Sequence, residues 1–177
     1  MNKEIEAKIR VESLEAIAER LGEVGGRFEC TQAQTDEYFM DTAEAMIKMD
    51  RGLRLRRQEV DGREVFLLTY KGPRDKTMFK SREEIEVEVA DVGTMRKLLL
   101  AMGLKVSVTV AKQRRLWRLG ECVVCLDDVT RLGSFVEVEG PTQEGISEVL
   151  GKLRLKGSDH ISDSYSKMVR NSIAGQA

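Results

Sequence analysis

The fold of this 177-residue chain is decided near its N-terminus, by the stretch Glu4-Ile5-Glu6-Ala7-Lys8-Ile9-Arg10-Val11. Charged and apolar side chains alternate along it, and in a β-strand alternate side chains point to opposite faces. Two carboxylates and two basic groups would therefore share one face. Because Glu, Ala and Lys also favour helices, one exposed helix over residues 3–20 is the alternative. The period changes only after Ser13, where apolar residues take helical spacing, so a strand followed by a helix is the better interpretation.

The same alternation recurs in three later segments, residues 53–56, 82–89 and 135–139. The ordinary explanation of such a strand is that its polar face lies in water. However, the sequence also predicts three amphipathic helices, over residues 13–24, 92–102 and 142–153, and each needs an apolar sheet face to cover. If the helices take the apolar faces, a curled sheet turns its charged faces inward. The pattern therefore predicts a barrel with a charged lumen.

Turn signals divide the rest of the chain into strands joined mostly by hairpins. The predicted order is β-α-β-β-β-β-α-β-β-β-α, an α+β fold with an eight-stranded antiparallel sheet. Residues 42–51 form a connection, either a helical turn or a mobile flap, and a short helix is expected within residues 159–170. We expect a single domain over residues 1–170 and a frayed C-terminal tail over residues 171–177.

Composition restricts the classes of function. Charged residues make up 33% of the chain but the net charge is only −1, so no global field favours nucleic acid. No apolar run approaches the length of a membrane span and no signal peptide is recognised, so a cytoplasmic protein without membrane association is expected. Three cysteines argue against a disulfide framework, and Cys122 and Cys125 are better buried thiols on opposite strand faces than half of a zinc site. A homodimer is left open.

The charged faces carry groups suited to phosphate and to divalent metal. Arginine forks bind phosphate oxygens bidentately and lysine ammonium groups act as point charges. We expect Lys80 to lie in solvent. Carboxylates spaced two residues apart on adjacent strands could seat one or two Mg²⁺ or Mn²⁺ ions, whose shells substrate phosphates and water would complete. The candidate metal ligands are Glu4, Glu6, Glu137, Glu139 and Asp127.

Glu4-x-Glu6-x-Lys8 resembles the ExExK signature of the CYTH superfamily, the triphosphate tunnel metalloenzymes. That superfamily groups class IV adenylyl cyclases with thiamine triphosphatases and inorganic tripolyphosphatases. The motif alone is weak in a charged chain, but an ordered series of further matches covers nearly the whole sequence. The matching segments are Asp36-Glu37-Tyr38-Phe39 with Asp41, Leu53-Arg54-Leu55-Arg56, Thr69-Tyr70-Lys71-Gly72, Arg82-Glu83-Glu84-Ile85-Glu86, Lys112-Gln113-Arg114, Leu126-Asp127, Leu132-Gly133 with Glu137-Val138-Glu139, and Ser164-Tyr165.

The resemblance implies an eight-stranded antiparallel tunnel with helices packed outside. It also implies a triphosphate site, formed by Lys8, Arg54, Arg56, Lys71, Arg82, Lys112 and Arg114. Among these and the acidic residues, Glu4, Glu6, Lys8, Arg56 and Arg114 would be catalytic.

The resemblance also implies the kind of reaction. The branch most similar to this chain is class IV adenylyl cyclase, in which ATP gives cyclic AMP and pyrophosphate. The alternatives are hydrolysis of thiamine triphosphate or inorganic tripolyphosphate, or a non-catalytic phosphate-binding module if the acidic pairs lie in solvent.

Overall fold

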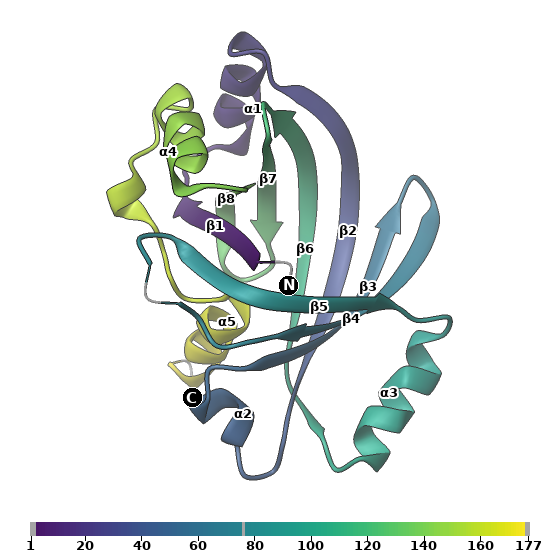
Figure 1. The fold of residues 1–177 in the computed structure, drawn as a ribbon. Coiled ribbons are helices and arrows are strands. Elements are labelled where there is room, and N and C mark those ends of the chain that lie inside the picture. The colour runs from purple at the N-terminus through teal and green to yellow at the C-terminus, as the bar shows by residue number, and fades with distance from the viewer. Residues whose placement is uncertain (1–2, 76, 176–177) are drawn as a thin grey trace.

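A computed structural model describes residues 3–75 and 77–175, with side chains from residue 5 onward. Eight strands form a closed antiparallel barrel in the order β1-β5-β4-β3-β2-β6-β7-β8 (Figure 1). The strands are β1 (Lys3–Arg10), β2 (Arg27–Met40), β3 (Gly52–Val60), β4 (Arg63–Lys71), β5 (Lys80–Glu88), β6 (Lys105–Leu119), β7 (Cys122–Val129) and β8 (Gly133–Gly140). The predicted fold class is confirmed.

The N-terminal strand closes the barrel, because β1 pairs with β5 on one side and with β8 on the other. Its register places Glu6 opposite Glu139 and Lys8 opposite Glu137 on β8. On the β5 side, Glu6 lies opposite Lys80. Residues facing one another across an antiparallel pair have adjacent side chains. This closure therefore brings the charged side chains of β1 and β8, which are far apart in the sequence, onto one face.

The helices are α1 (Leu14–Glu23), α2 (Ala45–Lys48), α3 (Val92–Ala101), α4 (Gln143–Lys152) and α5 (Tyr165–Ala174), with a 3₁₀ turn at Gly157–Asp159. The longer helices begin at polar N-cap residues. The Ser13 hydroxyl accepts a hydrogen bond from the Ala16 amide of α1, and the Ser164 hydroxyl accepts one from the Lys167 amide of α5. The segment 42–51 contains only the short α2, none of whose residues is buried. Among the described residues, no helix combines the length and the apolar character that a membrane span requires.

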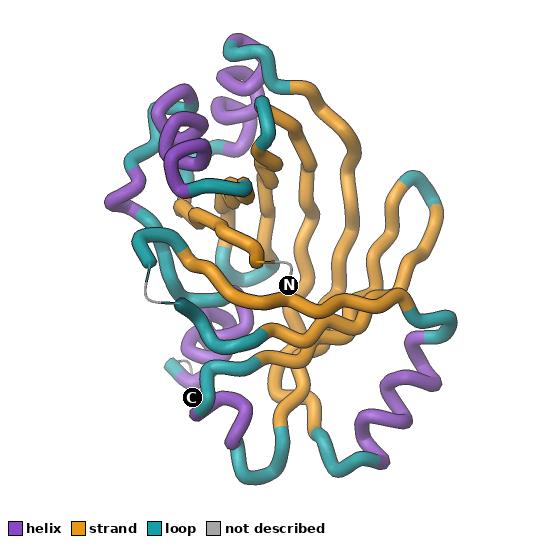
Figure 2. Tube along the Cα trace, viewed as in Figure 1, coloured by secondary structure: helices purple, strands orange, loops and turns teal. Residues whose placement is uncertain are grey.

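Helices cover the apolar outer face of the barrel at two places (Figure 2). α1 and α4 pack over β1, β7 and β8, where Leu21 and Ile146 join Val124 and Val138 in the largest core cluster. α3 packs over β3 through Leu99 and Leu55. Because these helices remove the apolar faces from water, the opposite, charged faces of the same strands point into the lumen.

α5 differs from the other helices because it packs against inner-face residues. Val108 and Val110 lie on the same face of β6 as the lumen residue Lys112, and they form a cluster with Tyr165 and Val169 of α5. The helix therefore occupies part of one end of the lumen. It also continues to Ala174, so the expected fraying from residue 171 is wrong for residues 171–174. In this last turn, the Ser172 hydroxyl donates to the Val169 carbonyl and the Gly175 amide donates to the Asn171 carbonyl.

Candidate active site in the barrel lumen

The lumen holds a cavity of about 1200 Å³. The prediction that charged strand faces enclose a cavity is confirmed, because charged side chains from seven strands, β1 to β6 and β8, line it. The lining includes Glu6, Lys8, Asp36, Arg54, Arg56, Lys71, Lys80, Arg82, Glu84, Glu86, Lys112, Arg114, Glu137 and Glu139.

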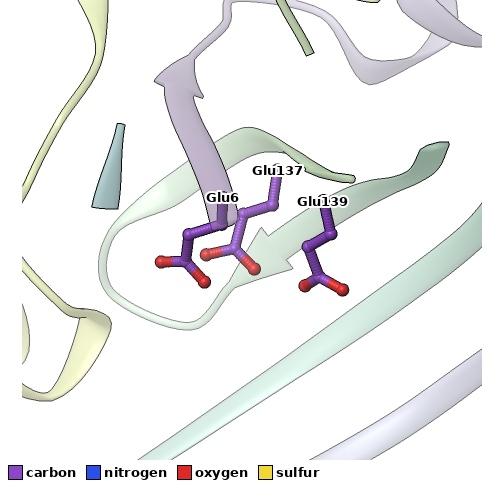
Figure 3. A group of neighbouring side chains, drawn as sticks. All are labelled: Glu6, Glu137 and Glu139. Carbon is purple, nitrogen blue, oxygen red and sulfur yellow. The ribbon is translucent and has the colours of Figure 1, made fainter. Parts of the chain in front are cut away.

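Three carboxylates converge in this cavity, from Glu6 on β1 and from Glu137 and Glu139 on β8 (Figure 3). One oxygen of each lies within 4.8 Å of the others. Burial raises the pKa of Glu139, and the negative charges of Glu137 and Glu6 raise it further, against the opposing effect of Arg114. The cluster thus has a surplus of negative charge that a cation would neutralise. Glu4, predicted to join it, has its side chain outside the described residues.

The other two carboxylates of the cluster are compensated by basic neighbours. Burial would raise the pKa of Glu6, but Lys80, assisted by Lys8, outweighs burial and lowers it to about 2. For Glu137, burial is likewise outweighed by Lys8 and Arg114, and its pKa is well below the ordinary value. The Lys8 ammonium lies 3.2 Å from a Glu137 oxygen and is 1% exposed. Both acids are therefore ionised and ready to act as oxygen ligands.

The donor set fits a hard divalent cation. Three carboxylates from two adjacent strands offer oxygen ligands alone, which Mg²⁺ and Mn²⁺ prefer, and the open cavity leaves room for phosphate oxygens and water. Cys125, on the neighbouring strand β7, is fully buried, and burial raises the pKa of its thiol well above the ordinary value, so it contributes no thiolate. Buried thiols at Cys122 and Cys125, as expected from the sequence, are confirmed.

Asp127 is predicted as a fifth metal ligand, and its surroundings point to another role. It is 0% exposed, and both of its oxygens already accept hydrogen bonds. Arg114 donates two, at 2.7 and 2.6 Å, and the Lys112 ammonium and the Tyr165 hydroxyl each donate one at 3.0 Å. Asp127 therefore orients Lys112 and Arg114, two of the predicted phosphate ligands. The Arg114 guanidinium also contacts Glu137, which links this network to the acidic cluster.

A second carboxylate positions the arginine pair on β3. Asp36 accepts two parallel bonds from Arg56, at 2.7 and 2.8 Å, and lies 3.8 Å from Arg54. Burial would raise the pKa of Asp36, but these arginines outweigh it and lower the pKa. Arg54 also donates to Thr69 at 3.0 Å and to Glu86 at 3.3 Å. Glu86 is thus a partner of lumen bases, as the sequence indicates.

Lys80 is not solvated, so that prediction is wrong. Its side chain is 7% exposed and its ammonium contacts Glu6. Lys80 lies on the same face of β5 as Arg82, and β5 is the partner of β1, so the ammonium faces the lumen. Lys71 pairs with Glu84 across β4 and β5. Arg82 is buried, its guanidinium lies 4.0 Å from Asp50, and its Nε has no hydrogen-bond partner among the described residues.

The sequence interpretation missed Tyr165 as part of the site. Its ring lies under two ammonium groups, with the Lys8 nitrogen 4.2 Å and the Lys112 nitrogen 5.0 Å from the ring centroid. The lysines therefore gain cation–π contacts as well as carboxylate partners. The Ser164-Tyr165 pair belongs to the segments that resemble the CYTH superfamily. No local sequence pattern indicates that α5 enters the lumen.

Comparison with known proteins agrees with this geometry. A relative named "Putative adenylate cyclase MJ0240", from Methanocaldococcus jannaschii, is 30% identical over 174 residues, which cover 93% of this chain and 97% of the relative. The solved structure of PH1819 from Pyrococcus horikoshii is 28% identical, has a TM-score of 0.85, and matches 96% of this chain and 99% of its own.

A more distant structure shares the fold at 18% identity. It is HpAC1 from Hippeastrum, described as having a dominant triphosphatase activity, with a TM-score of 0.67 and coverage of 94% of this chain and 93% of its own. The CYTH domain family model matches residues 2–165. The chain therefore belongs to the CYTH domain family, whose members are typically enzymes that process triphosphates with divalent metal ions.

Proposed function

We propose that this protein is a divalent-metal-dependent adenylyl cyclase of the class IV type, which converts ATP to cyclic AMP and pyrophosphate. The observation that carries the proposal is the three-carboxylate cluster, which lies beside oriented arginine and lysine side chains inside one cavity. A triphosphate chain brings about four negative charges at neutral pH, and several buried cations are needed to hold it. The name of the Methanocaldococcus jannaschii relative supports the same assignment.

The residues divide the work between binding and positioning. Arg54 and Arg56, with Lys112 and Arg114 across the lumen, would grip phosphate oxygens, while Asp36 and Asp127 keep the guanidinium groups oriented. Lys8, Lys71 and Arg82 would complete the triphosphate site.

Glu6, Glu137 and Glu139, with Glu4 on the same strand face as Glu6, would hold Mg²⁺ or Mn²⁺. The bound ion would supply charge neutralisation and a defined position for the attacking oxygen. In the cyclase reaction, the ribose 3′-hydroxyl attacks the α-phosphorus and pyrophosphate leaves. Lys8, held against Glu137 and Tyr165, is placed to stabilise the charge that develops on phosphate oxygens.

Hydrolysis of the terminal phosphate is the second candidate, because HpAC1 from Hippeastrum, which shares the fold, is described as mainly a triphosphatase. Thiamine triphosphate and inorganic tripolyphosphate would be its further substrates. Water would then replace the ribose hydroxyl as nucleophile while the same side chains hold the phosphate chain. A purely phosphate-binding module is less well supported, because Glu6 and Glu137 are buried rather than solvated.

One experiment distinguishes the reactions. The purified protein is incubated separately with ATP, thiamine triphosphate and tripolyphosphate under Mg²⁺ and under Mn²⁺, and the products are separated by chromatography. Cyclic AMP and pyrophosphate from ATP support the cyclase. ADP and phosphate support the triphosphatase, and absence of turnover with all three substrates contradicts both. Glu139→Gln serves as the metal-site control, and it should abolish turnover of whichever substrate is accepted.

A further inference from the structure

Three glutamine side chains line the lumen, and the reaction proposed above does not use them. Gln32 and Gln34 project from β2 and Gln58 from β3. The Gln34 amide nitrogen donates to the Gln32 carbonyl at 2.7 Å and to the Gln58 carbonyl at 2.8 Å. An amide nitrogen carries two hydrogens, so both are used within this amide cluster.

The remaining polar atom of Gln34 has no such partner. Its side-chain oxygen, Oε1, is buried and accepts no hydrogen bond from the described residues, and the residue as a whole is 3% exposed. A buried carbonyl without a donor has lost its hydrogen bond to water without replacement, and such groups are uncommon in folded proteins. Because Gln34 also lines the cavity, the missing donor can come from a bound molecule.

The amide cluster lies directly beside the proposed phosphate ligands. The strand register places Gln34 between Gln58 and Lys112, and it places Gln32 opposite Arg114. Side chains opposite one another on neighbouring strands are about 5 Å apart, so the next chemical group of a triphosphate held by Lys112 and Arg114 is within reach of the amides. Leu116, one step further along the inner face of β6, adds an apolar side chain to the same part of the cavity.

We propose that the amide cluster recognises the organic group of the triphosphate substrate, through a hydrogen bond donated to Gln34 Oε1. The inference rests on the proposed function and selects among its substrates. An ionised tripolyphosphate carries acceptors alone and cannot satisfy this oxygen, whereas the amine of a nucleobase and the hydroxyls of a ribose can. The adenine amine is a donor that a glutamine side-chain oxygen can accept from. The site therefore favours a nucleoside triphosphate over tripolyphosphate.

Equilibrium binding tests this assignment. Calorimetric titrations with ATP and with tripolyphosphate are made in EDTA, which keeps metal-dependent turnover out of the measurement. Wild type should bind ATP more tightly than tripolyphosphate. Gln34→Met keeps the side-chain volume but removes the acceptor, so it should lower the ATP preference by about tenfold and leave tripolyphosphate affinity unchanged. Gln113→Met is the matched control, because Gln113 is exposed on the outer face of β6, and it should change neither affinity.

Ligand analogues test the same point without any variant. Inosine triphosphate replaces the base amine with a carbonyl, and 2′-deoxyATP and 3′-deoxyATP each lack one ribose hydroxyl. Wild type should bind the analogue that lacks the donor about tenfold more weakly than ATP. The weaker analogue identifies the donor. Equal binding of ATP and all three analogues would overturn the inference, as would equal losses of affinity for ATP and for tripolyphosphate in Gln34→Met. Failure of wild type to bind any triphosphate both in EDTA and with Mg²⁺ present would overturn the proposed function together with the inference.

Discussion

Replacing Asp127 by asparagine separates a positioning role from metal ligation. The carboxylate accepts four hydrogen bonds, two of them from Arg114 and one each from Lys112 and Tyr165. Asparagine has nearly the same shape but carries one acceptor oxygen and an amide nitrogen that can only donate. At least one charge-assisted bond is therefore lost, and the two buried cations lose the negative charge that compensates them.

The expected loss of stability is large. Removing one partner of a buried, hydrogen-bonded ion pair costs about 3–5 kcal/mol of unfolding free energy. For a domain of this size, each kcal/mol corresponds to roughly 2–4 °C in melting temperature, so the melting temperature should fall by on the order of 10 °C. Asp128→Asn is the matched control, because Asp128 is the next residue on β7 and is exposed on the opposite face. It should melt at nearly the wild-type temperature.

The metal response provides the second measurement. Mg²⁺ or Mn²⁺ should raise the wild-type melting temperature, because a ligand that binds only the folded state stabilises it. If Asp127 only positions the basic side chains, Asp127→Asn should keep this rise, whereas Glu139→Gln should lose much of it. A variant Asp127→Asn that melts within about 2 °C of wild type would refute the stability argument. Loss of the metal response in that variant would show that Asp127 is a ligand after all.

Three further predictions concern the basic side of the lumen. Burial, together with the positive charge of Arg54, lowers the pKa of Lys71 to about 8. Triphosphate affinity should therefore fall as the pH rises through this value. Lys71→Arg should remove that fall when binding is titrated between pH 7 and 9. Arg56→Lys keeps the charge but loses the paired geometry, so turnover should drop about thirtyfold, or about 2 kcal/mol, in steady-state assays at fixed salt; an unchanged rate would mean that charge alone suffices. The lowered pKa of Asp36 contributes stability above about pH 4, and this stability is lost as the pH falls toward the folded-state pKa of Asp36. The urea midpoints at pH 7 and pH 3 should therefore differ less for Asp36→Asn than for wild type.

Much of the lumen could be predicted from the sequence because two periodicities constrain each other. Strand alternation places Arg54 and Arg56 on one face, and the amphipathic helices need the opposite, apolar face to pack against. The two patterns together place the charged side chains in the cavity. Strand alternation also places Lys80 inside, because Lys80 and Arg82 lie on the same face of β5. Its partner Glu6 is 74 residues away in the sequence, so the local pattern around Lys80 does not indicate it.

What the sequence could not indicate are contacts decided by long-range packing. Tyr165 reaches Asp127 only because α5 enters one end of the lumen, and its apolar side chains would equally suit the outer face of a sheet. The unpaired oxygen of Gln34 is likewise invisible locally, since it depends on which carbonyls lie within reach of the amide nitrogen. These features arise from the cross-strand register, which pattern reasoning leaves undetermined.

The buried carboxylates also explain how the lumen can hold many buried lysine and arginine side chains, remain stable and still bind a substrate. Asp36 and Asp127 are more deeply buried than the basic groups that they hold, so they stabilise those groups from behind and leave other N–H groups free for the cavity. Arg56, for example, uses Nε and Nη2 for Asp36, and a guanidinium has five N–H donors in all. Because the side chains are already ordered, less conformational entropy is lost when a triphosphate binds. The network of ion pairs therefore favours precise placement of phosphates, on which in-line attack depends, rather than simple attraction of negative charge.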